Sequence, residues 1–160
     1  DSYYIQKLGG DKKVDKLIGI APANHGVGGP IIAKWINEAL PDETPTSIED
    51  APKSVHMASY PQQLASSQLM KELYHSGKVT RPGVKYINIE GKYDYVVAPY
   101  TNAFIHEPGV KNITVQNICP QDHASHINFP YDTNVSQMVF NALDPDNAKP
   151  VKCKPQPFIG

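Results

Sequence analysis

Asp94 and His126 are the two residues of this chain whose types and order suggest a chemical reaction. Each follows a short apolar run typical of a buried strand, Val84–Ile89 before the acid and Ile113–Ile118 before the histidine. A neutral imidazole can take the proton of a serine hydroxyl, and a carboxylate behind it fixes the tautomer and stabilises the imidazolium. Loops that follow parallel strands meet at one edge of a sheet. We therefore predict that the two side chains lie within hydrogen-bond distance, as the acid and base of a serine hydrolase.

The serine nucleophile is the missing member of such a triad. No Gly-x-Ser-x-Gly elbow occurs in the sequence. Ser125 is adjacent to His126, but it follows the acid in the chain and lacks the strand–turn–helix context of an elbow serine. In α/β-hydrolases the nucleophile precedes the acid, and the acid precedes the base. We therefore expect the serine to lie upstream of Asp1, which would make the chain the C-terminal part of an enzyme.

Three longer segments carry a family resemblance. They are SYYIQKLGGDKKVDKLIGIAPANHG, GKYDYVVAPYTNAF, and CPQDHASHINFPYD with the following NALDPDNAKPVKC. In this order they resemble the segment after the nucleophile elbow, the acid loop, and the histidine loop with C-terminal tail of the secreted lipase class 2 family. The resemblance covers most of the chain outside Lys34–Gly77. The family's elbow serine and oxyanion-hole loop are not among the 160 residues.

The resemblance implies a secreted lipase or esterase that acts in lipid degradation and hydrolyses carboxylic esters without a cofactor. It places the catalytic acid at Asp94 and the base at His126. It also implies a disulfide between Cys119 and Cys153. The spacing of the cysteines alone excludes a C-x-x-C motif but leaves both a long-loop disulfide and two free thiols open. We expect the disulfide to hold Pro150–Gly160 beside the His126 loop.

Other residues admit other functions. Asp122, His123 and His126 form a D-H-x-x-H cluster that could ligate zinc, although no distant ligand accompanies it, and we expect His123 to point away from the Asp94–His126 pair. The glycine-rich stretch HGVGGP could bind phosphate in a nucleotide-binding module, but it matches neither G-x-G-x-x-G nor a P-loop. A non-catalytic fragment retained as a binding or structural protein is the third alternative, because an acid and a base without a nucleophile cannot transfer an acyl group.

Asn112 and Asn134 each begin an Asn-x-Ser/Thr triplet. Such triplets are N-glycosylation acceptors in a eukaryotic secretory pathway, which would make the protein a glycoprotein. Triplets of this kind also arise by chance, and an ordinary polar turn explains each of them equally well. Both asparagines are therefore candidate modification sites.

Composition limits the partners of the chain. A formal net charge of −1 gives no bulk attraction to nucleic acid or to an anionic membrane. No apolar stretch approaches the roughly 20 residues that span a bilayer, and the N-terminus has no signal-peptide core. Fifteen prolines in 160 residues exceed the usual proportion of about 5%, which favours many ordered loops. We expect no nucleic-acid partner, no transmembrane segment, and a secretion signal that lies upstream or has been removed.

Alternating strands and helices predict an α/β protein with a mainly parallel sheet flanked by helices. The further elements expected are a helix end at Tyr3–Leu8, a strand at Lys16–Ala21, helices at Ile31–Leu40, Gln62–His75 and Val135–Leu143, and a loop at Pro41–Lys53. The resemblance makes residues 1–160 a single partial α/β-hydrolase domain without the N-terminal strands and elbow. Residues 41–80 approximately would form a helical or loop insertion resembling a cap.

The strand predicted at Lys16–Ala21 bears on assembly. In a complete hydrolase fold its far side would pair with the strand that leads into the elbow. Alone, the chain should therefore present an unpaired apolar edge, and such edges recruit other strands. We expect the chain either to be accompanied by the N-terminal segment that carries the serine or to associate with itself.

Overall fold

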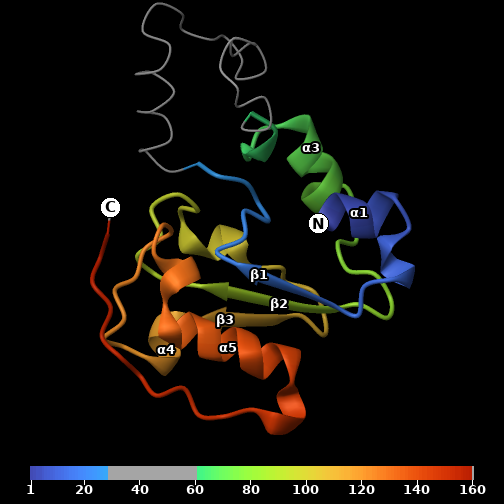
Figure 1. The fold of residues 1–160 in the computed structure, drawn as a ribbon. Coiled ribbons are helices and arrows are strands. Elements are labelled where there is room, and N and C mark those ends of the chain that lie inside the picture. Colours follow the sequence, from blue (N-terminus) through green and yellow to red (C-terminus); the bar gives the residue numbers. More distant parts are fainter. Residues whose placement is uncertain (29–60, 160) are drawn as a thin grey trace, which may run out of the picture.

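A three-stranded parallel sheet forms the centre of the molecule (Figure 1). The computed structural model describes residues 1–28 and 61–159. Strands β1 (Lys16–Ile20), β2 (Lys85–Glu90) and β3 (Lys111–Thr114) lie side by side in that order. The sheet and its flanking helices confirm the α/β architecture expected from the sequence. The helix predicted at Ile31–Leu40, the loop at Pro41–Lys53 and the first half of the insertion at 41–80 lie outside the described residues.

The central strand β2 separates two apolar layers because its side chains alternate between the faces of the sheet. Ile87 and Ile89 pack with Phe129 and with Val135 and Met138 of helix α5 (Thr133–Leu143). On the other face Tyr86 packs with Ile5 of helix α1 (Ser2–Lys7) and with Val79, Val84 and Ile105. Figure 1 shows α5 on one side of the sheet and α1 on the other.

The terminal helices begin and end where their local signals predict. Helix α1 ends before Gly9, which adopts the left-handed conformation (φ 74°) that glycine tolerates. Helix α5 begins after Asp132, whose side chain accepts the N–H of Asn134 at 2.7 Å, and it ends before Pro145. Short 3₁₀ turns complete the described chain at Gly10–Lys12, Pro61–Gln63, Tyr100–Ala103, Phe129–Tyr131 and Pro145–Asn147.

The strand predicted over Ile113–Ile118 is wrong in its last four residues. Strand β3 ends at Thr114, and residues Val115–Ile118 form a helical turn, α4. Within this turn the buried Gln116 side chain accepts the N–H of Lys92 at 2.8 Å and donates to the carbonyl of Asp122 at 2.9 Å. A short apolar run does not distinguish strand from helix. Here the helical turn lets the buried Gln116 amide bond both Lys92 and Asp122.

The helix predicted over Gln62–His75 is also shorter than expected. It begins at α3 (Gln68–Met70) and continues into a π-helical turn at Lys71–His75. Ser67 caps it by accepting the N–H of Met70 at 3.1 Å, while its hydroxyl donates to the carbonyl of Gln62 at 2.8 Å. The preceding Leu64 is buried and forms a bridge with Val27 instead. The serine cap, a local competitor of the helix, therefore sets the true start.

No helix within residues 1–28 and 61–159 combines the length and the apolar character that a membrane crossing requires.

Candidate active site

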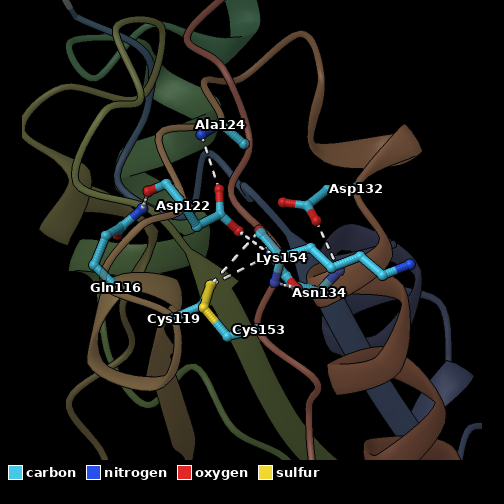
Figure 2. Close-up of a disulfide and its surroundings, with 8 residues drawn as sticks. All are labelled: Gln116, Cys119, Asp122, Ala124, Asp132, Asn134, Cys153 and Lys154. Carbon is cyan, nitrogen blue, oxygen red and sulfur yellow. Dashed lines mark hydrogen bonds between the residues drawn. A yellow bond between two sulfur atoms is a disulfide. The ribbon is translucent and has the colours of Figure 1, made fainter.

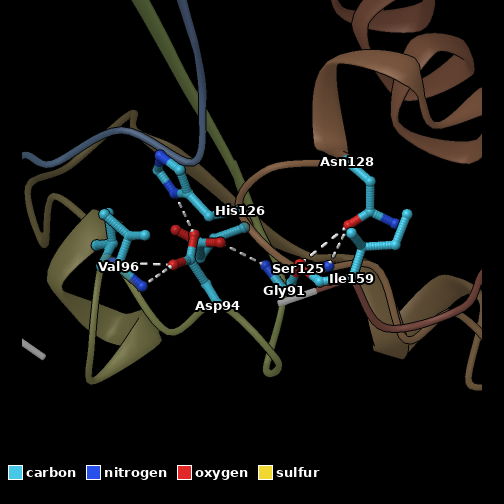
Figure 3. Close-up of polar contacts among 9 residues, drawn as sticks. Gly91, Asp94, Val96, Ser125, His126, Asn128 and Ile159 are labelled. Carbon is cyan, nitrogen blue, oxygen red and sulfur yellow. Dashed lines mark hydrogen bonds and ion pairs between the residues drawn. The ribbon is translucent and has the colours of Figure 1, made fainter. Parts of the chain in front are cut away.

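Asp94 and His126 meet at the carboxyl edge of the sheet (Figure 3). The Asp94 Oδ2 atom lies 2.7 Å from His126 Nδ1, which is the hydrogen-bond distance expected from the sequence. The carboxylate is fully buried, whereas 32% of the imidazole side chain is exposed. Because Nδ1 faces the acid, Nε2 is the nitrogen that remains for another group. Within the described residues, no hydrogen bond occupies Nε2.

Asp94, the expected acid, lies in a tight loop after β2, residues 91–97, which we call the acid loop. The N–H of Asp94 donates to the carbonyl of Gly91 at 3.1 Å, which closes a turn directly after the strand. Asp94 Oδ1 then accepts the N–H groups of Val96 at 2.7 Å and Val97 at 2.8 Å. These bonds fix the carboxylate through one oxygen and leave the other oxygen directed at the imidazole.

His126, the expected base, lies in the loop between α4 and α5, residues 119–132, which we call the base loop. Hydrogen bonds fix this loop as well. Ser125, next to His126, is buried; its N–H donates to Asn128 Oδ1 at 2.7 Å, and its hydroxyl bonds Asn128 Oδ1 and the carbonyl of Ile159. Figure 3 shows Ser125 beside Asn128 and Ile159, on the side away from His126. Ser125 is therefore a structural residue of the base loop and is not placed as a nucleophile.

An apolar cavity of about 330 Å³ opens beside His126. Its lining comes from the segment after β1, the turn Pro61–Gln63, the acid loop and the base loop: Ala21, Ala23, Val27, Gln63, Val96, His126 and Ile127. The exposed edge of the imidazole thus borders a largely apolar space. Such a space suits the acyl or alkyl part of an ester.

The residues of the D-H-x-x-H cluster do not converge. The His123 ring is exposed and packs edge-on against Tyr93, with ring centroids 4.8 Å apart, while His126 contacts Asp94. The Asp122 carboxylate is buried and accepts the N–H of Ala124 at 2.9 Å and the amide of Asn134 at 2.8 Å. Across the part of the chain that the structure describes, no group of three His, Cys, Asp or Glu side chains is arranged to hold a metal ion.

The start of the glycine-rich stretch is engaged within the fold. The N–H groups of His25, Gly26 and Val27 donate to the carbonyls of Asn102, Ala23 and Gln63 at 2.9, 3.0 and 2.8 Å. These groups are therefore not free to cradle a phosphate. His25 Nε2 lies 2.9 Å from the carbonyl of Phe104, and burial lowers the pKa of this histidine. His25 therefore has a structural role, through its hydrogen bond with Phe104 and its ring contacts with Tyr74 and His75.

The C-terminal tail is joined to the base loop through a disulfide (Figure 2). Cys119 and Cys153 are bonded, with their Cα atoms 5.0 Å apart, which confirms the expected pairing. Beside the disulfide, Asn134 accepts the N–H of Lys154 at 3.0 Å and donates to its carbonyl at 2.7 Å. Further along, the N–H of His123 donates to the carbonyl of Gln156 at 3.0 Å. The tail therefore packs against the loop that carries His126.

Both candidate glycosylation sites have structural roles in the fold. Asn134 is 1% exposed, and its side-chain nitrogen donates to Asp122 Oδ2 and to the carbonyl of Lys154. Asn112 donates to the carbonyl of Ile105 at 3.0 Å and accepts the amide of Asn88 at 2.9 Å. A glycan is attached through this same side-chain nitrogen, so it would displace these contacts. The folded structure thus has no accessible acceptor nitrogen at Asn134.

Three buried polar residues at the site, Glu90, Gln116 and Asp132, were not predicted from the sequence. Glu90 is fully buried at the end of β2, and Asp132 is 2% exposed at the start of α5. A charged residue at the end of an apolar run was the only signal for Glu90. Asp132 caps helix α5 and lies beside the buried Asp122.

The raised pKa of the Asp132 carboxyl group can be tested through the pH dependence of stability. Burial, and next a hydrogen bond with Asp122, raises the pKa of Asp132 from 3.8 to about 6. The folded protein therefore binds this proton more tightly than the unfolded chain. The contribution of Asp132 to stability is full below about pH 4 and is lost as pH rises through about 6. Asp132→Asn keeps an acceptor for the helix cap and removes the charge. We expect the variant to be more stable than the parent near pH 8 by roughly 1–3 kcal/mol, with little difference near pH 4.

Urea unfolding at the two pH values measures this effect. Asp144→Asn is the matched control because Asp144 is exposed near the other end of the helix. A parent and an Asp132→Asn variant of equal stability at both pH values would show that Asp132 is not protonated preferentially in the fold.

The fold and site define an α/β protein with a buried aspartate and a partly exposed histidine at the carboxyl edge of a parallel sheet. Comparison with known proteins finds no protein-family model that matches the chain and no curated protein of similar sequence. The functional assignment therefore depends on the geometry of the site.

Proposed function

We propose that this chain is the acid- and base-bearing part of a secreted serine hydrolase that cleaves carboxylic esters, with lipids as the substrate class. The observation that carries the proposal is the 2.7 Å contact between the buried Asp94 carboxylate and Nδ1 of the partly exposed His126. The resemblance to class 2 lipases supports the lipid substrate, as does the apolar cavity beside His126. The disulfide is consistent with an oxidising compartment such as the extracellular space.

In this mechanism His126 acts first as general base and then as general acid. Its Nε2 takes the proton of a serine hydroxyl as that oxygen attacks the ester carbonyl, and it returns the proton to the leaving alcohol. Asp94 holds Nδ1–H and stabilises the imidazolium between these steps. Water then attacks the acyl-serine ester while His126 Nε2 takes its proton. The histidine returns the proton to the serine oxygen as the carboxylic acid leaves. The reaction uses no cofactor.

The serine is proposed to come from a segment that pairs with β1. Within the described residues β1 pairs with β2 alone, and its end is open, with Ile20 40% exposed. A cavity of about 340 Å³ lies along this strand, lined in part by Tyr4, Leu17 and Ile18. A parallel strand added on the free side of β1 would bring its carboxyl end to the same edge of the sheet as the Asp94 and His126 loops, which is the edge where an elbow serine must lie.

This arrangement predicts how the 160-residue chain behaves alone. We expect it to hydrolyse p-nitrophenyl esters no faster than background, to take no label from a fluorophosphonate probe, and to associate with itself through the β1 edge, as measured by light scattering. The polypeptide isolated from its source, with the serine-bearing segment present, should be labelled and active.

The outcomes separate the proposal from its alternative. An active, labelled monomer of the 160 residues would show that the nucleophile lies within them. A folded source polypeptide that takes no label and hydrolyses no ester would favour a non-catalytic binding or structural protein. The intact mass of the source material shows which polypeptides are present.

A further inference from the structure

Glu90 is a fully buried carboxyl group directly beside the acid–base pair. It is the last residue of β2 and is 0% exposed. Its Oε1 accepts the N–H of Gly91 at 2.7 Å. Its Oε2 is also buried and, among the described residues, has no hydrogen-bond partner. A buried carboxylate with a single donor is strongly disfavoured, so this group needs either a proton or another donor.

The second carboxyl group of the site determines where the charge lies. The Glu90 side chain is within hydrogen-bond reach of Asp94. Asp94 has three donors, the N–H groups of Val96 and Val97 and the His126 imidazole, whereas Glu90 has one. Two adjacent buried carboxyl groups do not both ionise, and hydrogen bonds to the charged form favour ionisation. Asp94 therefore keeps the charge, and Glu90 keeps the proton.

The residue after Glu90, Gly91, is closely packed. A Cβ atom on Gly91 would lie 2.5 Å from the Phe129 ring and 3.2 Å from the Gln116 amide. Phe129, at 1% exposure, thus packs directly over the end of β2, which only a residue without a side chain permits. The ring covers the face of the strand end that carries Ile87 and Ile89, while the Glu90 side chain, which points to the opposite face, is itself 0% exposed.

We propose that Glu90 is protonated in the folded protein and donates its O–H to the Asp94 carboxylate, as a positioning residue behind the Asp94–His126 pair. The proton supplies the interaction that Oε2 otherwise lacks. A fourth donor on Asp94 also restricts rotation of the carboxylate, so that Oδ2 stays directed at His126. Burial, followed by the charge of Asp94, raises the pKa of Glu90 to about 10, in agreement with this assignment. The catalytic consequence rests on the proposed function, but the protonation does not.

Carboxyl-carbon NMR on the glutamate-labelled chain tests the protonation directly. We expect one glutamate resonance to remain at the position of the protonated acid near pH 8, where an ordinary glutamate is ionised. This resonance should be missing in Glu90→Gln and present in Glu107→Gln. Glu107 is the matched control because its carboxylate accepts the N–H groups of Val79 and Thr80, at a distance from the pair along the chain. A set of glutamates that all ionise near pH 4–5 would overturn the proposal.

Two substitutions then separate positioning from simple packing. Glu90→Gln keeps a neutral donor, whereas Glu90→Met keeps the volume and removes the donor. We expect the low-field Nδ1–H proton signal of His126 to persist in Glu90→Gln and to shift or broaden in Glu90→Met. In the complete enzyme kcat should fall about tenfold in Glu90→Met, with KM unchanged and Glu90→Gln near the parent.

Failure of this inference is distinct from failure of the proposed function. Identical spectra and kcat for the Gln and Met variants would show that Glu90 only fills space, while the hydrolase proposal would stand. A protonated Glu90 in a protein without esterase activity would support the buried hydrogen bond and refute only the catalytic role.

Discussion

In the enzyme that the proposed function describes, Asp94→Asn should lower the rate of ester hydrolysis about a thousand- to ten-thousand-fold. The asparagine carbonyl can still accept the N–H groups of Val96 and Val97, so the loop should keep its shape. Its amide N–H₂ would then face His126 Nδ1, which must become the acceptor. The proton of the imidazole moves to Nε2, the nitrogen that has to receive the serine proton. The base is thereby held in the wrong tautomer.

Steady-state kinetics on a p-nitrophenyl ester measures this loss, with circular dichroism as the check on folding. Asp146→Asn is the matched control because Asp146 is exposed in the turn after α5. The control should retain the parent rate. A correctly folded Asp94→Asn variant within tenfold of the parent would remove Asp94 from the catalytic assignment and leave its contact with His126 as a structural one.

Removal of the disulfide should have the largest effect on stability. Replacing Cys119 and Cys153 by serine opens a loop with a sequence separation of 34 residues, which should cost about 3–4 kcal/mol of unfolding free energy. The loss should begin in the tail because the disulfide is its covalent attachment to the base loop, and the remaining attachments, such as those of Asn134 and His123, are hydrogen bonds. We expect faster amide exchange in residues 151–159 and the His126 loop than in β2.

Urea unfolding and hydrogen exchange measure these two effects. A serine pair elsewhere is no control for a cross-link, so the parent protein under reducing conditions serves instead and should match the double variant. Equal stability of the oxidised and reduced proteins would show that the polar contacts of the tail are sufficient without the bond. Uniformly faster amide exchange across the sheet and the tail would show that the Cys119–Cys153 disulfide does not act locally.

Local signals in the sequence were sufficient for much of the scaffold. Strands β1 and β2 are short apolar runs beside glycine, proline or charged residues, and α5 combines apolar spacing with an aspartate cap. These features act within a few residues along the chain, so they can be recognised without knowledge of the tertiary structure. The contact between Asp94 and His126 could also be predicted, because both residues follow strands and parallel strands bring their carboxyl ends to one edge of the sheet.

Tertiary structure decided the features that depend on distant partners. Val115–Ile118 became a helical turn because the Gln116 amide satisfies backbone groups of both the acid loop and the base loop. Asn134 became the centre of the disulfide network because Lys154 and Asp122 approach it from elsewhere in the chain. Phe129 packs against Gly91 at the end of β2, and the adjacent Glu90 is fully buried.

The sequence by itself thus determined the strands, the C-terminal helix and the acid–base order, because each follows from periodicity, capping or chain direction. Only the tertiary structure decided which polar groups are buried and paired. Burying a polar group is favourable only when a partner is present, and that partner can come from any position in the chain. For that reason Asp94 and His126 could be selected in advance, whereas Glu90 and Asn134 could be recognised only after the chain was folded.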